Sequence, residues 1–547
     1  MSLFTSVRPG EGTSVLYLFS SAFVLLAAYY LLKPVRESLI LSEGSAEIRA
    51  YSVGIVALVL LFVIPLYKRL FTGLALAENK SRVLRWVSLF FISNLLIFCL
   101  IGNLGIPISV PFFVWLSIFN VMVLAQFWGF AADLYNTKSG QRLFVVIMVG
   151  ASIGAWVGSQ VAKQLFGFFG PYSIMLISAG LLLVPVWLSA LAEKNVPEGS
   201  ACHEKRSAAE KPPGFKALLG GFDVVFRSHY LLLLAALVFL LNMINTTGEF
   251  IVSLMVDQRA EAMLAMAGNT LSKAQLVGAS YGEYFSWINL ISLGLQLFVV
   301  SRLFRKFGVR GAILVLPVFM LLHYGALLIF PVFVAVRWLM IGENSILYSI
   351  QNTTNQTLYL PLSREQKYVG KTTIDTFFVR FGDLAQALMV YVGLNIAGLT
   401  VTGFIVINMV CALALIFVAL DIRRSHKSQI KEKLSNLPPR IVTPLPNIQV
   451  PAGQLTMFSV PDDCFFDPDP GDTLDYSASL EDGSALPVWV RFDTYNQTFT
   501  VRPPVASDGQ LRLHLTATDF EGLYASGVFA LDYAPLSALN ISPSEQG

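Results

Sequence analysis

Two cations and one carboxylate stand close together near the end of the first long apolar run of the chain, in the segment YYLLKPVRES from Tyr29 to Ser38. Lys33, Arg36 and Glu37 fall within about one helical turn, so they share a face if the helix continues through Pro34. Charged groups are costly to bury in hydrocarbon and are retained mostly where they line a water-filled cavity or meet a partner. The segment therefore predicts an ion or substrate pathway, with interfacial residues that snorkel to lipid headgroups as the alternative.

Further candidate residues lie in later apolar runs at helical spacing. Asn245 and Glu249, in the segment NMINTTGEF, are four positions apart and share one helical face. Lys371 and Asp375, in GKTTID, have the same spacing, and Arg337 lies on the polar face of another run. These side chains are candidates for binding a polar or charged solute inside the membrane. The alternative is that they form hydrogen bonds between helices and hold a helical bundle together.

The composition is that of a polytopic membrane protein. Of the 547 residues, 55% are hydrophobic and 13% are charged, and the mean hydropathy is +0.64. The four cysteines are scattered without the spacing of a metal site or a disulfide framework. The chain contains no phosphate-binding glycine loop and no nucleophile placed with a base, which argues against an ATP-hydrolysing pump and against an enzyme. We expect no required cofactor and no nucleic-acid partner.

With about 20 apolar residues taken as one membrane crossing, the sequence predicts twelve helical spans in two sets of six. The first set is predicted at residues 14–41, 50–67, 83–102, 108–132, 143–167 and 171–192. The second set is predicted at residues 229–256, 278–301, 311–330, 332–352, 372–395 and 400–421. The first run is long enough to span, so we expect a helix of the mature protein there and not a cleaved leader. This all-α bundle of 6+6 helices resembles the major facilitator architecture.

The two halves of the bundle are predicted at residues 1–192 and 229–425, joined by a polar loop at residues 193–228. Within this loop, the stretch from Phe215 to Phe226 predicts a short surface helix. Lys and Arg gather in the second and eighth loops, in the central loop and after the last span. Because cytoplasmic loops carry this excess, both ends of the bundle are predicted in the cytoplasm. We expect the chain to lie in the inner membrane of a bacterium.

The composition changes after the last span. A charged and Pro-rich linker is predicted at residues 426–446, and a disordered tail is predicted at residues 536–547. From residue 437 onward the chain has 14 acidic residues and 4 arginines. Alternating runs such as LRLHLTATD and QTFTV, separated by Asp-Gly and Pro breaks, predict an all-β sandwich of the immunoglobulin or cadherin-like kind at residues 447–535.

Three motifs of the membrane region resemble those of the nucleotide transporters that exchange ATP for ADP in plastids and intracellular bacteria. They are KPVRES followed by GSAEIRAY, FWGFAADLYNTKSGQR, and YLPL with a charged spacer and GKTTID. The resemblance implies that Lys33 and Lys371 help to bind nucleotide phosphates and that Glu249 is essential. Lysine supplies a compact cation suited to a polyphosphate. Arg36 and Glu37 are then expected either to orient Lys33 or to close an outer gate.

The resulting hypothesis is a secondary transporter in the lipid bilayer that moves an anionic metabolite by alternating access, with ATP and ADP as candidate substrates. A proton-coupled symporter, in which Glu249 or Asp375 takes up and releases the proton, is one alternative. A membrane scaffold that no longer transports and presents the β-sandwich to a partner is another. The polar stripes inside the spans argue against the scaffold, because an anchor does not need them.

The segment FFDPDPGDTLDYSASLEDGSALPVWVRFD, with the later TATDFEG, resembles the dystroglycan-type cadherin-like module of bacterial surface proteins. By this resemblance Asp467, Asp469, Asp472 and Asp519 are candidate Ca²⁺ ligands, because clustered carboxylate oxygens suit a hard cation. The alternative is that these acids are solvated turn residues. We expect the domain to contact a protein partner.

Overall fold

The computed structural model describes the chain in twelve stretches: residues 11–74, 80–135, 137–196, 215–266, 269–363, 365–435, 437–461, 463–469, 473–494, 496–505, 507–519 and 522–535. Contacts divide the chain into two compact units. The first unit, Met1–Leu360 with Val369–His426, is helical, and the second, Pro361–Tyr368 with Lys427–Gly547, carries the β-strands.

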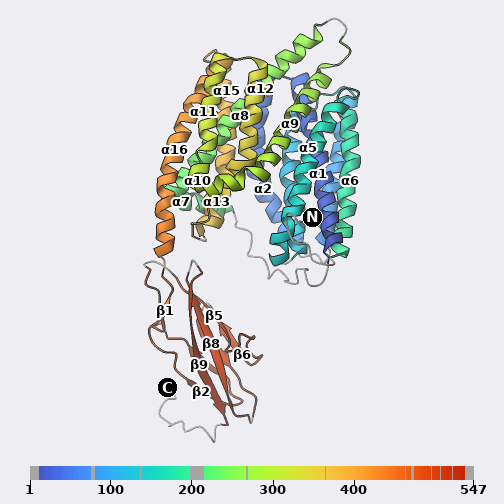
Figure 1. The fold of residues 1–547 in the computed structure, drawn as a ribbon. Helices are drawn as coiled ribbons and strands as arrows, with labels where there is room; N and C mark the ends of the chain where they lie inside the picture. The colour runs from blue at the N-terminus through green and yellow to red at the C-terminus, as the bar shows by residue number, and fades with distance from the viewer. Residues whose placement is uncertain are drawn as a thin grey trace. The chain divides into compact units, whose positions relative to one another are not determined.

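Six long helices form the first half of the helical unit (Figure 1). They are α1 (Gly12–Glu43), α2 (Ala46–Leu74), α3 (Lys80–Asn103), α4 (Ser109–Leu134), α5 (Thr137–Leu165) and α6 (Pro171–Lys194). Each contains a stretch that is long and apolar enough to cross a membrane. These helices coincide with the six spans predicted for this half, because each depends on an uninterrupted apolar run.

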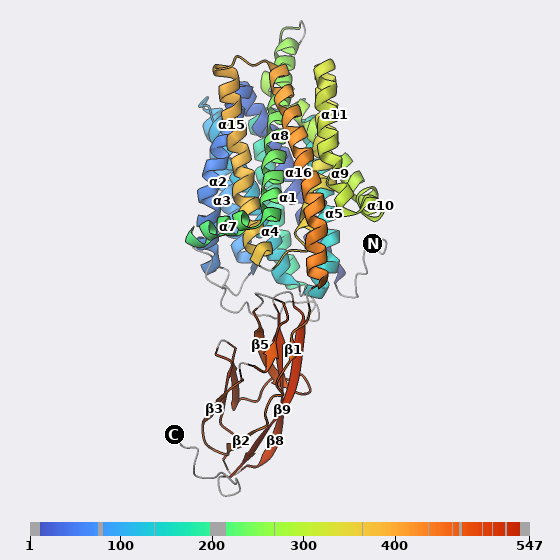
Figure 2. The same cartoon turned by 90° about the vertical axis from the view of Figure 1, so that its left-hand side faces the viewer.

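The second half begins with α7, the surface helix predicted in the central loop, and continues with a more irregular set of helices. They are α7 (Phe215–Arg227), α8 (His229–Leu264), α9 (Lys273–Phe298), α10 (Val300–Ala312), α11 (Val315–Ile329), α12 (Phe333–Ile346), α13 (Asn352–Leu358), α14 (Lys371–Thr373), α15 (Val379–Asn395) and α16 (Val401–Ser435). Figure 2 shows α8 between α15 and α16. Asn242 on α8 donates to Val379 O at 2.8 Å, and Asn408 on α16 donates to Ile244 O on α8 at 3.1 Å.

The described residues contain nine helices long and apolar enough to cross a membrane, or ten when α9 and α10, bent by 74°, count as one span. Every predicted span has a helical counterpart, but α11 has only 15 residues and α12 only 14 before its hydrogen bonding changes. The prediction counted both as full crossings, because apolar composition does not show where helical hydrogen bonding tightens or loosens. The basic loop predicted after the eighth span is α10, in which the chain turns at Gly308 with φ 65°.

Three π-helical turns interrupt the second half: η2 (Leu347–Gln351), η3 (Gln366–Gly370) and η4 (Ile374–Phe378). The last two flank α14, a three-residue helix that begins with Lys371. π-helical turns are rare and are often found at functional sites. The segment predicted to bind phosphate therefore has irregular backbone hydrogen bonding.

Small residues allow α5 to approach α1 closely. A Cβ atom at Gly154 would lie 2.1 Å from the carbonyl oxygen of Phe23, and one at Gly158 would lie 2.3 Å from that of Ala27. No side chain larger than hydrogen fits at these separations. The α1–α5 contact thus fixes the position of the helix that carries Lys33.

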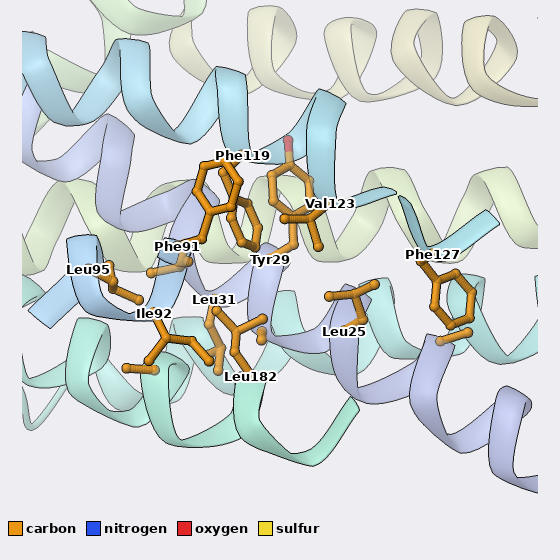
Figure 3. Close-up of a cluster of buried hydrophobic side chains, with 14 of the residues drawn as sticks. Leu25, Tyr29, Leu31, Phe91, Ile92, Leu95, Phe119, Val123, Phe127 and Leu182 are labelled. Atoms are coloured by element: carbon orange, nitrogen blue, oxygen red, sulfur yellow. The ribbon is translucent and has the colours of Figure 1, made fainter. Parts of the chain in front are cut away.

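A buried apolar cluster holds α1 against α3, α4 and α6 (Figure 3). Its aromatic members include Tyr29 on α1, Phe91 on α3 and Phe119 on α4. The rings of Tyr29 and Phe119 are stacked with centroids 6.4 Å apart, and those of Phe91 and Phe119 meet edge to face at 5.3 Å. Tyr29 lies one turn before Lys33, so this packing also positions the charged end of α1.

Alternating buried residues build the β unit. Its nine strands are β1 (Arg440–Ile441), β2 (Ile448–Pro451), β3 (Thr456–Ser459), β4 (Phe465–Phe466), β5 (Asp475–Leu480), β6 (Val490–Asp493), β7 (Thr498–Val501), β8 (Gly509–Thr518) and β9 (Tyr524–Ala534). One sheet has the order β2-β9-β8-β5 and another β3-β7-β6, while β1 pairs with β4. Leu513 and Leu515 of β8, Phe499 of β7 and Phe529 of β9 are buried in one core. This unit has the all-β fold that the sequence predicted.

Candidate functional site

An ion-pair network joins the two halves of the helical unit at Arg49, a buried residue in the first turn of α2. Its Nε donates to Glu37 on α1, and its Nη2 donates to Glu249 Oε2 on α8 at 3.3 Å. Glu37 is fully buried and also accepts hydrogen bonds from Arg36. A buried ion that loses its partner is strongly destabilising, so Arg49 ties α1, α2 and α8 together.

Glu249 is the point at which four helices meet. Its Oε1 accepts hydrogen bonds from the hydroxyl of Tyr284 on α9 at 3.0 Å and from Asn344 Nδ2 on α12 at 3.2 Å. Asn344 is held in turn by Asn245, whose Nδ2 donates to Asn344 Oδ1 at 3.2 Å. With Arg49 on its other oxygen, Glu249 links helices of both halves, and its side chain is 15% exposed.

Lys33 lies one turn before Glu37 on α1 but has a different environment. Its Nζ is 4.0 Å from the ring centre of Phe285, 5.3 Å from that of Tyr30 and 6.0 Å from that of Tyr348. Among the described residues, Lys33 forms no hydrogen bond and no ion pair. Its ammonium group is stabilised by these aromatic faces, each contributing about 0.5–2 kcal/mol, and by longer-range attraction to the carboxylates of Glu249 and Glu37.

The charges of the network balance one another without Lys33. Arg36 and Arg49 offset Glu37 and Glu249, with which they form ion pairs. A lysine at the centre of a membrane helix costs about 2.5–3.5 kcal/mol on insertion scales. An anionic ligand would reduce that cost. This part of the structure is therefore suited to binding an anion at Lys33, beside rings that can stack on a planar group.

Arg337 belongs to a second ion cluster. Its Nη2 lies 2.9 Å from Glu283 Oε1 on α9, and Lys163 Nζ on α5 lies 3.5 Å from the same oxygen. Arg337 also lines a small pocket with Tyr284 and Phe333. The cluster connects α5 of the first half with α9 and α12 of the second, so the contacts of Arg337 are those of a residue that joins helices.

Lys371 and Asp375 are not joined to the network of Lys33 and Glu249 by any hydrogen bond or ion pair of the described residues. Lys371 Nζ donates to Gln356 Oε1 at 2.5 Å and lies 5.5 Å from the ring centre of Tyr359. Asp375 is exposed. The structure therefore keeps the two predicted phosphate-binding lysines in separate environments.

Hydrogen bonds join the halves between α5 and α9, where Asn289 Nδ2 donates to Ser159 Oγ at 3.1 Å, and also where α1 leads into α2. Ser38 Oγ on α1 donates to Ala274 O at the start of α9 at 2.7 Å. Asn395 Nδ2 at the end of α15 donates to Glu47 Oε1 in the first turn of α2 at 3.1 Å. Arg49 lies two positions beyond Glu47, so the ion-pair network is part of the same closed end.

The predicted Ca²⁺ ligands of the β unit are held in turns. Asp467 Oδ1 accepts from Asp469 N at 2.9 Å, and Asp469 Oδ2 accepts from Leu437 N at 2.7 Å. Asp519 Oδ1 accepts from Leu523 N at 2.8 Å, while Asp472 lies outside the described residues. The described part of the chain contains no group of three His, Cys, Asp or Glu residues arranged to hold a metal ion. The Asp467–Asp469 contact has the spacing of an Asx turn, whereas the Asp469–Leu437 contact joins segments far apart in the chain. Ca²⁺ binding stays a prediction.

Arg49 and Tyr284 were absent from the residues that the sequence pointed to, although both contact Glu249. The sequence predicts that the second span starts at residue 50, so Arg49 is expected in the loop before it. In the structure α2 begins at Ala46, with Glu47 in its first turn. A carboxylate in the first turn stabilises a helix, so Glu47 was the signal that would have placed Arg49 inside the helix.

Comparison with known proteins relates the membrane region to nucleotide carriers. The chain is 26% identical over 314 residues to ADP,ATP carrier protein 1 of Chlamydia pneumoniae, a match that covers 49% of this chain and 57% of that protein. It is 22% identical over 439 residues to ADP,ATP carrier protein 5 of Rickettsia bellii, covering 67% of this chain and 84% of that protein. In the first match, the chain thus spans little more than half of its relative.

Solved transporters share the fold of the helical unit. The nucleoside transporter NupG aligns with a TM-score of 0.53 at 12% identity, over 76% of this chain and 99% of its own. A bacterial homologue of the lysosomal transporter Spinster aligns with a TM-score of 0.50 at 11% identity, over 78% of this chain and 99% of its own. Residues 438–534 match the family model described as "Putative Ig domain". The predicted combination of a facilitator-like bundle and an immunoglobulin-like domain is confirmed.

Proposed function

We propose that this chain, a homologue of the ADP,ATP carrier proteins with an immunoglobulin-like domain near its C-terminus, is a secondary transporter that exchanges nucleotides across a membrane. The observation that carries the proposal is the environment of Lys33. Its ammonium group lies over Phe285 without a carboxylate partner among the described residues, beside a network whose own charges balance. A phosphate group supplies the missing negative charge, and the rings of Phe285 and Tyr348 offer faces on which a base can stack.

Alternating access accounts for the way in which the two halves are joined. The Arg49–Glu249 ion pair and the Ser38–Ala274 hydrogen bond hold them together at the α1–α2 end. Separation of the halves at this end requires these two contacts and the Asn395–Glu47 hydrogen bond to break, and a bound anion alters the electrostatic balance that keeps Arg49 on Glu249. Carriage of this kind needs no covalent chemistry, in agreement with the carrier names of the relatives.

We further propose that both ends of the bundle face the cytoplasm of a bacterial cell. The support is the excess of Lys and Arg in the predicted cytoplasmic loops and in the stretch from Arg423 to Lys433. The immunoglobulin-like domain then lies in the cytoplasm, where we expect it to contact a protein partner. Protease added to intact spheroplasts should leave the domain uncut, and cleavage from outside would reverse the orientation.

Counterflow in proteoliposomes tests the transport proposal. Vesicles that hold the full chain are loaded with unlabelled ATP, and labelled ADP is added outside. We expect the label inside to rise above its equilibrium level for a time, because exchange uses the outward gradient of ATP. Matched vesicles loaded with inorganic phosphate and vesicles without protein are the controls. Equal label in all three kinds of vesicle would reject nucleotide exchange.

A further inference from the structure

A second buried pair of titratable groups lies inside the second half of the helical unit. Glu343 on α12 is fully buried, and His323 on α11 is 2% exposed. Glu343 Oε2 and His323 Nε2 are 3.2 Å apart. Both atoms are buried, and neither forms a hydrogen bond of normal distance and angle with any described residue. The sequence patterns did not single out either residue. A carboxylate and an imidazole facing each other in an apolar bundle are costly to retain without a function.

Two amide side chains connect this pair to Glu249. Asn245 Nδ2 donates to Glu343 Oε1 at 3.4 Å and to Asn344 Oδ1 at 3.2 Å. Asn344 Nδ2 donates to Glu249 Oε1 at 3.2 Å. The two carboxylates thus belong to one hydrogen-bonded chain, and a change of charge on one affects the other.

The other titratable groups around Glu343 are neutral tyrosines and the carboxylate of Glu249. The ring centres of Tyr324 on α11 and His323 are 3.9 Å apart. The hydroxyl of Tyr284 on α9 accepts a hydrogen bond from Asn344 Nδ2. On α12 itself, Arg337 is paired with Glu283 of α9. Within the described residues, His323 is therefore the sole ion-pair partner of Glu343.

Charge counting shows what such a pair can bind. With no added proton the pair carries one negative charge, with one proton it is neutral, and with two it carries one positive charge. Burial disfavours both charged states, so the pair holds a single proton while the site is dry. The proton resides on Glu343 Oε2 or His323 Nε2, and either arrangement places a donor opposite an acceptor across the 3.2 Å separation.

We propose that Glu343 and His323 form a proton-binding site that is loaded and emptied during the transport cycle. When the halves part, Glu249 loses Arg49 and its negative charge is no longer offset. A proton on the Glu343–His323 pair then keeps that pair neutral, so that Glu249 and Glu343 together carry less negative charge. Water that reaches the pair in the opened state exchanges the proton. The link to nucleotide movement rests on the proposed function, but the site itself does not.

Infrared difference spectroscopy of the full chain in lipid bilayers tests the site without any substrate. Spectra recorded between alkaline and acidic pH should show the carbonyl stretch of a protonated carboxylic acid. Because the other carboxyl groups of the chain also become protonated, the Glu343 band is obtained by subtracting the Glu343→Gln difference spectrum from that of the wild type. His323→Gln should shift the pH at which this band appears, because the imidazole no longer shares the proton. Glu283→Gln is the matched control and should leave the band unchanged, since Glu283 is already paired with Arg337.

Two outcomes overturn the site. One is the absence of a carbonyl band from the wild-type spectrum after the Glu343→Gln spectrum is subtracted, and the other is a Glu343 band that titrates at the wild-type pH in His323→Gln. Each variant must first match the wild-type elution profile in size-exclusion chromatography. If Glu343→Gln fails to fold, the His323→Gln spectrum decides alone.

Transport measured in the same vesicles separates the two proposals. With an imposed pH gradient, we expect the uptake of labelled ADP by the wild type to change at least severalfold. Uptake by His323→Gln should be the same with and without the gradient. A titrating band without any nucleotide uptake would reject the proposed function and keep the proton site. Nucleotide exchange without a titrating band would reject the proton site and keep the proposed function.

Discussion

Lys33 differs from Arg36 and Glu37 of the same segment in that it forms no ion pair within the described residues; Arg36 also lies over a ring, that of Phe113, but is paired with Glu37. Arg36 and Glu37 are paired with each other, which supports a role in positioning the end of α1. The nearest ring, that of Phe285, comes from α9 in the other half of the bundle. At the residue scale, the sequence identified Lys33 as a cation that is costly to place in a membrane helix. Which side chains surround Lys33 depends on how α1 and α9 pack.

The first prediction concerns the charge of Lys33. Lys33→Gln should lower the nucleotide affinity in counterflow by about 10- to 100-fold, because a charge-assisted hydrogen bond contributes about 1.5–3 kcal/mol. Lys33→Arg should retain more of the affinity, since it keeps the charge. Lys163→Gln, which removes a lysine from an ion pair on α5, is the control and should remain close to wild type. Equal affinity in Lys33→Gln and the wild type would exclude a role for Lys33 in binding.

The second prediction concerns the other lysine of the resemblance. Lys371→Gln should also lower exchange, because its side chain binds Gln356, lies near the ring of Tyr359 and forms no ion pair within the described residues. The initial rate of labelled ADP uptake measures the effect. A wild-type rate would exclude a role for Lys371 in exchange.

At the element scale, polar contacts join the helices of the two halves at the α1–α2 end and also between α5 and α9. Asn242 and Glu249 lie on the same stripe of α8, yet Asn242 binds Asp383 of α15 and Glu249 binds Arg49 of α2. Both contacts join helices, as the hydrogen-bonding alternative expects, and solute binding along this stripe stays a prediction. Periodicity revealed the polar face of α8 but not which neighbour each residue would meet.

The third prediction tests Arg49 as a contact that closes the α1–α2 end. Arg49→Gln leaves Glu249 without its cation, so the halves should part more often at this end. Spin labels at Ile48→Cys and Ile396→Cys, in a chain without its native cysteines, should show longer distances by electron-spin resonance. Both positions are exposed in the wild type.

The control for this experiment is Arg142→Gln. Arg142 also pairs with a buried carboxylate, that of Glu11 at 2.7 Å, but both residues belong to the first half. Its loss should reduce stability without changing the distance between the labels. If Arg49→Gln and Arg142→Gln have the same effect on the distance, the Arg49 pair is not specific to the closed end.

The fourth prediction concerns the packing of α5 on α1. Gly154→Ala places a methyl group 2.1 Å from the Phe23 carbonyl oxygen, so the helices must separate and the melting temperature should fall by several degrees. Gly180→Ala on α6 has open space and should be neutral or stabilising by up to about 1 kcal/mol. Thermal unfolding in detergent measures both, and an unchanged Gly154→Ala would contradict the close approach.

At the scale of the whole molecule, the chain combines a transporter-like bundle with a separate β unit that has its own buried core. The fifth prediction follows from this independence. A chain that ends at residue 436 should keep the exchange rate of the full protein, and residues 437–547 expressed alone should fold cooperatively. Loss of exchange in the truncated chain, with normal elution in detergent, would show that the β unit takes part in the cycle.

The sequence by itself determined the membrane class, the facilitator-like bundle and the β-sandwich, and it singled out Lys33 and Glu249 as candidate site residues. These features depend on composition, local periodicity and short motifs, which a chain carries before it folds. Only the tertiary structure decided that Arg49 bridges to Glu249, 200 positions away, and that His323 faces Glu343. The reason is physical: an ion pair forms where two helices meet, and the apolar runs that insert the helices contain no information on which polar groups will meet.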